Sequence, residues 1–340
     1  MSQTFVYNHP FKLESGGILP SITIAYDTFG TRSENDDNII WVCHALTANS
    51  DVADWWPHTV EKDCFLDPEK YFTICANFLG SHYGTTGPLS INEATGKPWF
   101  GDFPRITVRD MVNCHRLLAK HLGIKHVKLL IGSSIGGFQC LEWSIMEPDF
   151  AEHAAFIATT PRTKPWASAF NESQRMAIEA DPTFGQASPT AGDKGMAVAR
   201  SIALLSYRGA VAYNKTQEDA EPQNSSFDRR VLSYQRHQGE KLRKRFNAYS
   251  YYRLSEAVDS HNLARGRGSL ENALRSIRAK SLVVAITSDI LFPPEDHSEL
   301  IEYIPNVQFA LIDSEFGHDG FLVEHKKLND LITNFLNLEK

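Results

Sequence analysis

A glycine-flanked serine is the feature of the sequence with the clearest chemical meaning. Residues 129–137 read Leu-Leu-Ile-Gly-Ser-Ser-Ile-Gly-Gly, so an apolar strand runs directly into Gly-x-Ser-x-Gly around Ser134, and a helical stretch follows at 138–146. Gly132 and Gly136 leave room for a sharp strand-to-helix turn, which lifts the Ser134 hydroxyl toward the positive end of the helix. We interpret Ser134 as a nucleophile; the alternative is a serine that only caps the helix.

A serine nucleophile needs a histidine as base and a carboxylate that orients the histidine. In sheets that carry such a turn, the acid and then the histidine follow on loops after late strands. Asp289 directly follows the predicted strand 281–287, and His318 follows the predicted strand 307–313. The sequence therefore predicts a catalytic triad of Ser134, Asp289 and His318.

Other interpretations of the acid and the histidine remain open. Asp289 is also a common type of turn residue, and His318 could be a structural residue of its loop. Asp296 and Asp313 are rival acids, but Asp296 lies too far beyond the first of these strands and Asp313 still belongs to the second. Glycines on either side of the pair His318-Asp319 favour a loop shaped to present the histidine.

Acyl transfer also needs hydrogen-bond donors for the oxyanion that develops on the attacked carbonyl. The backbone N–H of Ile135, the residue after the serine, is one expected donor. The second is expected from the loop after an early strand, which reads His-Ala-Leu-Thr at 44–47, and we favour the N–H of Leu46. His44 is expected to pack beneath this loop.

The elements that must position these residues have the pattern of a mainly parallel sheet. Seven short apolar runs rich in β-branched residues are predicted strands: 21–26, 38–43, 71–76, 127–131, 154–158, 281–287 and 307–313. Continuous apolar character without alternation is typical of parallel strands covered by helices on both faces. Predicted helices at 107–122 and 138–146 complete the α/β pattern.

The strand pattern stops after residue 160 and resumes at 281. The sequence between about 164 and 278 is helical in character, which predicts a helical lid domain over 164–278. The lid interrupts an α/β core made of residues 1–163 and 279–340. The polar segment 214–227 is predicted to be an exposed loop between lid helices.

Composition excludes several classes of function. The 340 residues carry a formal net charge of −7 and no long basic run, so nucleic acid is not an expected partner. The one small basic cluster, 241–245, fits a solvated helix face that could also meet anionic phosphates. No segment has the length and apolarity of a membrane span or of a signal-peptide core. Five cysteines without Cys-x-x-Cys spacing and 13 histidines without a metal pair predict a cytoplasmic protein with reduced thiols and no metal.

Several motifs together resemble those of homoserine O-acetyltransferases. The matching segments are 44–47, 77–88, 103–112, 132–137 and 317–321, with 170–175 and 245–251 inside the inserted block, and the likeness runs from Phe5 to Phe335. The resemblance implies an α/β-hydrolase fold with a helical lid, assembled as a homodimer. It also implies transfer of an acetyl group from acetyl-CoA, used as a co-substrate, to the hydroxyl of L-homoserine in methionine biosynthesis, with no permanently bound cofactor.

The resemblance also supplies residues for recognition of the amino acid. Arg200 and Tyr207 are seven residues apart, about two helical turns, so both project from one face. The resemblance implies that Arg200 clamps the substrate carboxylate, that Tyr207 adds a hydrogen bond and that Asp319 binds the substrate ammonium. The alternatives are an ordinary ion pair on the lid helix for Arg200 and a helix cap for Asp319.

The predicted reaction has two steps, with an acetyl-enzyme on Ser134 as the intermediate. Rival functions are a homoserine or serine O-succinyltransferase, a serine esterase and a catalytically silent binding protein. Some positions depart from the family pattern: Ala-Asn-Ser at 48–50 stands where many members have Gly, and Asn247 and Asn262 stand where Asp is usual. These departures lie in segments that could shape the acyl or lid pocket, and they leave the acyl donor open.

Overall fold

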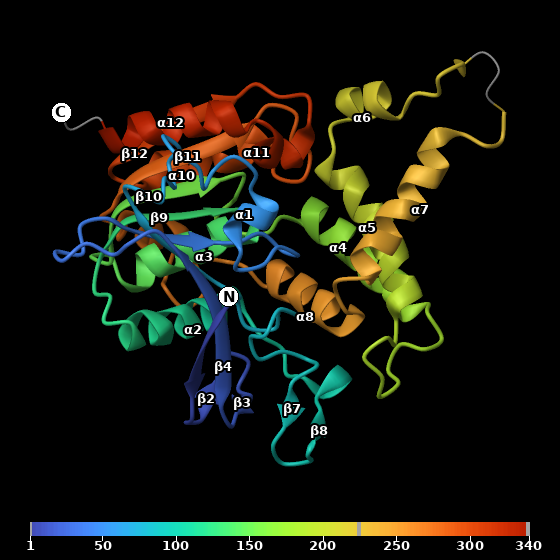
Figure 1. The fold of residues 1–340 in the computed structure, drawn as a ribbon, viewed down its shortest axis with the longest axis horizontal. Coiled ribbons are helices and arrows are strands. Elements are labelled where there is room, and N and C mark those ends of the chain that lie inside the picture. The colour runs from blue at the N-terminus through green and yellow to red at the C-terminus, as the bar shows by residue number, and fades with distance from the viewer. Residues whose placement is uncertain (1, 223–225, 338–340) are drawn as a thin grey trace.

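The computed structural model describes residues 2–222 and 226–337, and an eight-stranded sheet forms its centre (Figure 1). In spatial order the strands are β1 (Gln3–Tyr7), β4 (Ile22–Phe29), β6 (Phe72–Ala76), β5 (Ile39–Cys43), β9 (Val127–Ser133), β10 (Ala151–Ile157), β11 (Lys280–Ile286) and β12 (Val307–Ile312). Neighbouring strands pair in parallel along the series β6, β5, β9, β10, β11 and β12. β4 pairs antiparallel with β1 on one side and with β6 on the other. The α/β fold with a mainly parallel sheet is confirmed.

All seven predicted strands are present, but the sequence did not indicate β1. This strand pairs only with β4, at the edge of the sheet, and most of its side chains are exposed. A strand with one neighbour and little burial needs no apolar run, so its sequence lacks the signal that marks the central strands. Two small hairpins also lacked that signal: β2 (Phe11–Lys12) with β3 (Ile18–Leu19), and β7 (Ile91–Asn92) with β8 (Lys97–Pro98).

Helices cover both faces of the sheet, and the alternate residues of β5 show why its sequence is apolar throughout. Ile39, Trp41 and Cys43 join the hydrophobic cluster beneath α2 (Val108–His121) and α3 (Ile135–Met146). Ile40 and Val42 join the second cluster, beneath α1 (Val52–Trp55) and α12 (His325–Asn337). Two short helices, α10 (Ser298–Tyr303) and α11 (Gly320–Val323), complete the C-terminal part.

Between β10 and β11 the chain forms helices. They are α4 (Pro165–Glu179), α5 (Asp193–Tyr207), α6 (Ala210–Gln217), α7 (Arg230–Arg243), α8 (Ala248–Asp259) and α9 (Leu270–Arg275). We call residues 164–278 the lid. Within it α4 packs on α5 and α8, α5 packs on α7, and α5, α6 and α7 extend away from the sheet (Figure 1).

The predicted loop at 214–227 is wrong over its first four residues, which form the last turn of α6. This turn is polar because it is exposed, and Lys215 anchors it to the core through an ion pair with Glu315 at 2.5 Å. Residues 223–225 of the predicted loop lie outside the described residues.

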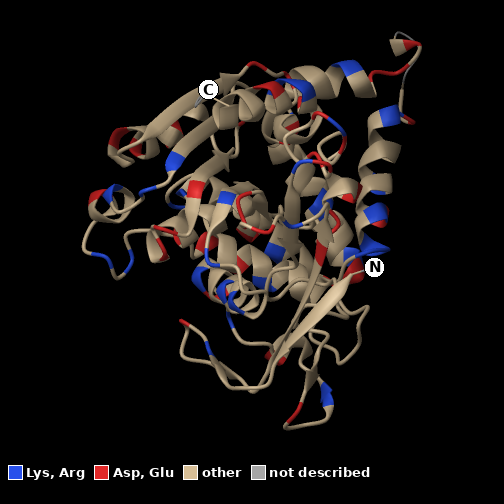
Figure 2. Cartoon of the chain, turned by 60° about the vertical axis from the view of Figure 1, so that its left-hand side comes forward, with Lys and Arg blue, Asp and Glu red and all other residues tan. Residues whose placement is uncertain are grey.

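Charged residues of both signs are interspersed along the helices and loops, whereas the strands of the sheet carry few (Figure 2). No helix within 2–222 and 226–337 is long and apolar enough to cross a membrane.

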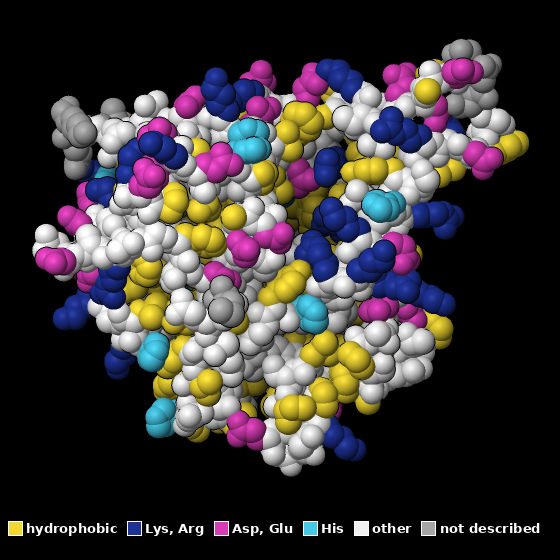
Figure 3. All heavy atoms as spheres, viewed as in Figure 1, with side chains coloured by type: hydrophobic (Ala, Val, Ile, Leu, Met, Phe, Trp, Pro, Cys, Tyr) yellow, Lys and Arg dark blue, Asp and Glu magenta, His cyan; other side chains and the backbone are white. Residues whose placement is uncertain are grey.

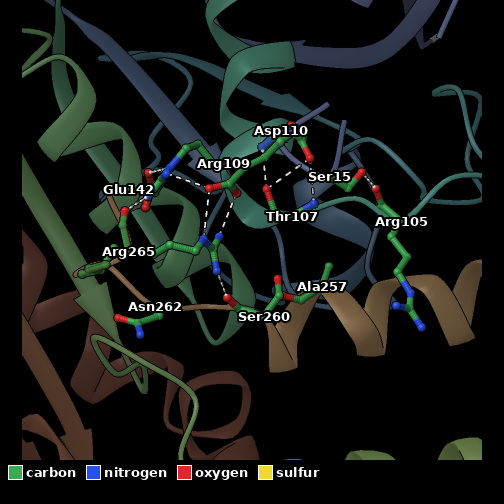
Figure 4. Close-up of polar contacts among 12 residues, drawn as sticks. Ser15, Arg105, Thr107, Arg109, Asp110, Glu142, Ala257, Ser260, Asn262 and Arg265 are labelled. Atoms are coloured by element: carbon green, nitrogen blue, oxygen red, sulfur yellow. Dashed lines mark hydrogen bonds and ion pairs between the residues drawn. The ribbon is translucent and has the colours of Figure 1, made fainter. Parts of the chain in front are cut away.

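An ion-pair network joins the end of the lid to the core (Figure 4). Arg109 of α2 lies between two carboxylates, 2.6 Å from Glu142 of α3 and 2.7 Å from Glu14 near the N-terminus. Arg265 and Arg267, on the segment that follows α8, pair with Glu14 and Glu142 respectively. The return of the chain from the lid is therefore fixed to two elements of the core.

Candidate active site

The turn between β9 and α3 places Ser134 as the sequence predicts. Ser134 has φ 56°, a left-handed conformation that costs a non-glycine residue energy, and its side chain makes no capping hydrogen bond to α3. A Cβ on Gly132 would lie 2.4 Å from the backbone of Gly136, and a Cβ on Gly136 would lie 2.0 Å from the carbonyl oxygen of Cys43. Both glycines are therefore required by close backbone approach, and the interpretation of Ser134 as a helix cap is wrong.

The structure brings Ser134, His318 and Asp289 together. Nε2 of His318 lies 2.9 Å from Oγ of Ser134, and Nδ1 lies 2.6 Å from Oδ2 of Asp289. The other oxygen of Asp289 accepts the backbone N–H groups of Leu291 and Phe292, at 2.8 and 3.0 Å, which fixes the carboxylate. This chain of hydrogen bonds can pass a proton from the serine to the histidine.

The rival carboxylates lie elsewhere. Asp296 pairs with Lys164 at 2.6 Å. Asp313 lies just after β12, not within it as expected, and its carboxylate accepts a hydrogen bond from Thr287.

The surroundings of His318 favour its charged form. Burial by itself lowers the pKa of the imidazole, but the carboxylate of Asp289, with a smaller effect of Asp319, outweighs burial and raises the pKa above its ordinary value. A histidine of this kind is a stronger base, and it loses its proton only as the pH rises through that raised pKa.

Leu46 and Ile135 both line a cavity of about 20 Å³ beside Ser134. Ile135 is the first residue of α3, where a backbone N–H has no acceptor inside the helix. The remaining lining is almost wholly apolar and contains no charged side chain: Phe138, Ala167, Asn171, Tyr207, Val258, Leu291 and Phe292. The space next to the nucleophile is therefore small and apolar.

His44 packs beneath the oxyanion loop, which we define as residues 44–47. Its ring is buried and stacks on Phe78 with the ring centroids 4.2 Å apart, and Nδ1 lies 2.8 Å from the carbonyl oxygen of Ala45. Burial lowers the pKa of His44 to about 4, so the ring is neutral near pH 7.

A larger cavity of about 340 Å³ opens beside Ser134 and His318, between the core and the lid. We call it the acceptor cavity. Arg200 and Tyr207 of α5 line it, and the guanidinium of Arg200 lies 5.7 Å from the centroid of the Tyr207 ring. Arg200 forms no ion pair with any residue that the structure describes, so the alternative of an ordinary ion pair on the lid helix is wrong.

Asp319 also lines the acceptor cavity, and Oδ2 of its carboxylate lies 2.7 Å from Nε of Arg208. Its side chain makes no capping hydrogen bond to α11, so the alternative of a helix cap is wrong. Burial raises the pKa of Asp319, and the positive charges of Arg208 and Arg200 oppose that rise.

Sequence reasoning missed two arginines of this site. Arg208 directly follows Tyr207 at the end of α5, a position that could have marked it. Arg245, just after α7, donates to the carbonyl oxygen of Thr47 at 2.5 Å and to the hydroxyl of Tyr83 at 2.6 Å. The lid thus fixes the oxyanion loop through Arg245, a contact that only the docking of the lid reveals.

The departures from the family pattern have separate explanations. Asn247 caps α8 by accepting the backbone N–H of Ser250 at 2.8 Å, and Asn262 accepts the backbone N–H of Ala264 at 3.0 Å. In Figure 4 Asn262 lies apart from the ion-pair network. Neither asparagine lines the two cavities, whereas Ala48 and Asn49 line the acceptor cavity.

Comparison with known proteins agrees with this geometry. The family described as alpha/beta hydrolase fold matches residues 38–325. A homoserine O-acetyltransferase of Cyclobacterium marinum is 42% identical over 336 residues, which are 98% of this chain and 95% of that protein.

Two solved structures share the fold over nearly the whole chain. A homoserine O-acetyltransferase from Bacillus anthracis superposes with a TM-score of 0.90 at 24% identity, covering 99% of this chain and 97% of the other. An acetylester hydrolase from Corynebacterium glutamicum superposes with a TM-score of 0.87 at 22% identity, covering 99% of this chain and 96% of the other. The fold is thus common to transferases and esterases, and the side chains of the site must distinguish the two activities.

Proposed function

The chain belongs to the homoserine O-acetyltransferase family of the α/β-hydrolase fold, and from this premise we propose how its residues acetylate L-homoserine. The donor is acetyl-CoA and the product is O-acetyl-L-homoserine, a compound of methionine biosynthesis. One observation carries the proposal: Ser134, hydrogen-bonded to His318, faces a cavity lined by Arg200 and Asp319, the two charges that a free amino acid requires.

In the first step His318 accepts the proton of Ser134 while Oγ attacks the thioester carbonyl. The backbone N–H groups of Leu46 and Ile135 stabilise the oxyanion. The C–S bond then breaks, the thiolate receives the proton from His318, and the acetyl group remains on Ser134. Asp289 holds the imidazole in the required tautomer and stabilises its positive charge.

In the second step L-homoserine enters the acceptor cavity. Arg200 binds its carboxylate with a forked pair of donors, Tyr207 adds a hydrogen bond, and Asp319 binds its ammonium. The carboxylate of Asp319 lines the acceptor cavity while its Oδ2 lies 2.7 Å from Nε of Arg208. His318 removes the proton of the homoserine hydroxyl, which attacks the acetyl-enzyme and releases Ser134.

The small cavity beside Ser134 favours an acetyl over a succinyl group. A space of about 20 Å³ holds roughly one water-sized group, and the methyl of an acetyl group is about that size. A succinyl chain would add a carboxylate, and the lining supplies no cation to pair with a charge that is costly to bury. The zwitterion-binding residues likewise favour an acyltransferase over an esterase of neutral esters.

The assembly we propose is a homodimer formed through the lid. Val198, Leu205, Val211 and Leu232, on α5, α6 and α7, are each more than half exposed. Apolar side chains gathered on helices that extend from the core are typical of an association surface. Light scattering of the wild type and of Val198→Glu tests this assembly, and an unchanged mass would contradict it.

We propose that the protein acts in the cytoplasm with no resident cofactor. Its five cysteines are unpaired thiols, as in proteins of a reducing compartment. The serine, histidine and oxyanion donors together supply the nucleophile, the base and the charge stabilisation that acyl transfer requires.

A matrix of donors and acceptors tests the proposed function. Purified protein is mixed with acetyl-CoA or succinyl-CoA and with L-homoserine, L-serine or water, and the free thiol and the ester product are measured. We expect acetyl-CoA with L-homoserine to exceed every other pair. If free thiol is released faster with water alone than with L-homoserine, the protein is instead a thioesterase.

A further inference from the structure

We propose that Lys241 and Arg245 form the site for the phosphate groups of the acyl donor, at the lid side of the acceptor cavity. The inference rests on the proposed function, since it takes the donor to be a coenzyme A thioester. It assigns a role to the basic cluster 241–245 that the reaction steps leave unused.

The charges that line the acceptor cavity are unbalanced. Its cations are Arg200, Arg208, Lys241 and Arg245, and its carboxylates are Asp54 and Asp319. Arg208 and Asp319 neutralise each other at 2.7 Å. The remaining cations outnumber the remaining carboxylate, Asp54. When Arg200 binds the amino-acid carboxylate, Lys241 and Arg245 still exceed Asp54 by one charge, and neither of them forms an ion pair with it in the part of the chain that the structure describes.

The partners of these two residues support an anion site. Arg245 donates to neutral oxygen atoms, the carbonyl of Thr47 and the hydroxyl of Tyr83, and no carboxylate among the described residues pairs with its charge. Lys241 is exposed and has no hydrogen bond or ion pair within 2–222 and 226–337. Both side chains are therefore available to an incoming anion.

Lys241 and Arg245 share one face of the chain. They are four residues apart, and the helical turn continues past α7, because the backbone N–H of Phe246 donates to the carbonyl of Leu242 at 3.0 Å. Residues at this spacing lie one above the other. Figure 3 shows Lys and Arg side chains gathered beside α7 along a hollow between the core and the lid.

The size of the cavity indicates which part of the donor meets these cations. A volume of about 340 Å³ lies at the lower end for small-molecule sites, enough for the thioester end and the amino acid. The nucleotide must then remain at the opening, where exposed cations can reach its phosphates. Lys241 and Ser134 line the same cavity, so one molecule can contact both.

Arg243 provides a matched control on the same turn. It lies two residues after Lys241, about 200° around the helix, and pairs with Glu240 at 2.9 Å, outside the acceptor cavity. Lys241→Ala and Arg243→Ala each remove one positive charge from α7, but only the first changes the lining of the cavity. Arg245 is unsuitable as the principal variant because it also holds the oxyanion loop.

The experiment compares acetyl-CoA with S-acetyl-pantetheine, which has the same thioester but no phosphate, at saturating L-homoserine. Lys241→Ala is expected to raise the KM for acetyl-CoA about 3- to 10-fold, and Lys241→Glu further. The KM for S-acetyl-pantetheine and kcat should stay unchanged, and Arg243→Ala should resemble the wild type. At about 1 M salt the Debye length is about 3 Å, so the KM of Lys241→Ala for acetyl-CoA should then exceed that of the wild type by less than about twofold.

Two results would overturn the proposal while leaving the proposed function intact. One is an unchanged KM for acetyl-CoA in Lys241→Glu. The other is an equal rise for both donors, which would place Lys241 at the thioester end. If the wild type acetylates homoserine from neither donor, the proposed function fails and this inference fails with it.

Discussion

The identity of the residue that orients His318 determines the pH at which the serine becomes a nucleophile. Asp289 raises the pKa of His318, and only the neutral imidazole can act as base, so the rate of acylation should rise with pH through that raised pKa. Asp289→Asn removes the charge and leaves burial, which lowers the pKa. We expect the midpoint of the rising limb to move to lower pH and kcat to fall about 10⁴-fold, because the tautomer is wrong. The pH profile of kcat/KM for acetyl-CoA measures both effects, and an unchanged midpoint would assign the pKa to another group.

Replacement of Arg200 should impair the second half-reaction, with L-homoserine, and spare the first, the acylation of Ser134. Arg200→Ala removes the clamp on the amino-acid carboxylate, a loss of roughly 2–4 kcal/mol, or about 30- to 1,000-fold in kcat/KM for L-homoserine. Acylation of Ser134 by acetyl-CoA should survive, because the thioester end has no such carboxylate. Arg200→Lys is the control that keeps the charge but lacks the fork, so its loss should be intermediate. A slower acylation with an unchanged KM for homoserine would instead assign Arg200 to the donor.

At the level of secondary structure, the turn between α5 and α6 presses on the loop that carries His318. A Cβ on Gly209 would lie 1.9 Å from the carbonyl oxygen of Glu315, and a Cβ on Gly317 would lie 2.5 Å from the backbone nitrogen of Gly209. The lid and the histidine loop therefore meet backbone to backbone, with no room for a Cβ at either glycine.

Gly209→Ala should displace the loop of His318. We expect a loss of about 1–3 kcal/mol in the free energy of unfolding from overpacking, together with a lower kcat. Gly101→Ala is the control, because its Cβ would lie at an ordinary 3.6 Å from Tyr249. Urea unfolding and kcat of both variants check this prediction, and full activity in Gly209→Ala would show that the contact can be relaxed.

The secondary-structure elements also show which parts of the fold and of the site could be predicted from the sequence. The central strands were predictable because burial on both faces demands continuous apolar runs, and Asp289 was predictable because it lies on the loop after one of them, β11. His318 lies on the loop after β12, an edge strand that is largely exposed but still has a nearly continuous apolar sequence. The edge strand β1 was not predictable, because little burial lets it begin with the polar residues Gln3 and Thr4 and leaves too short an apolar run to mark a strand. Arg208 and Arg245 act through the docking of the lid on the core, which no local pattern encodes.

Across the whole molecule, Glu142 links α3, α2 and the end of the lid. Its carboxylate is 3% exposed and contacts Arg109 and Arg267. Burial raises the pKa of Glu142, but the two guanidinium groups together outweigh burial and hold the pKa below its ordinary value. A carboxylate with a lowered pKa stabilises the fold above its unfolded pKa, and that stabilisation disappears as the pH falls through the folded pKa.

Glu142→Gln should therefore destabilise the protein at neutral pH by about 1–3 kcal/mol. The difference in unfolding free energy from the wild type should begin to narrow as the pH falls below about 4.3, the ordinary pKa of a glutamate, because the unfolded wild type then takes up a proton, and it should vanish once the pH is below the lowered pKa of Glu142 in the folded protein. Urea unfolding of both proteins at pH 7 and at about pH 4 tests whether the difference in unfolding free energy narrows or widens as the pH falls. A difference that widened at acid pH would contradict the assignment of the charged form to Glu142.

The central claim, a covalent acetyl group on Ser134 that passes to homoserine, is tested most directly by mass spectrometry of the quenched protein. Mixing with acetyl-CoA alone should give one acetyl adduct, located on Ser134 by peptide mapping and absent from Ser134→Ala. Adding L-homoserine without further donor should remove the adduct and yield an equal amount of O-acetyl-L-homoserine. If homoserine is acetylated at the normal rate while no adduct forms on Ser134 at any quench time, transfer is direct and the two-step account is wrong.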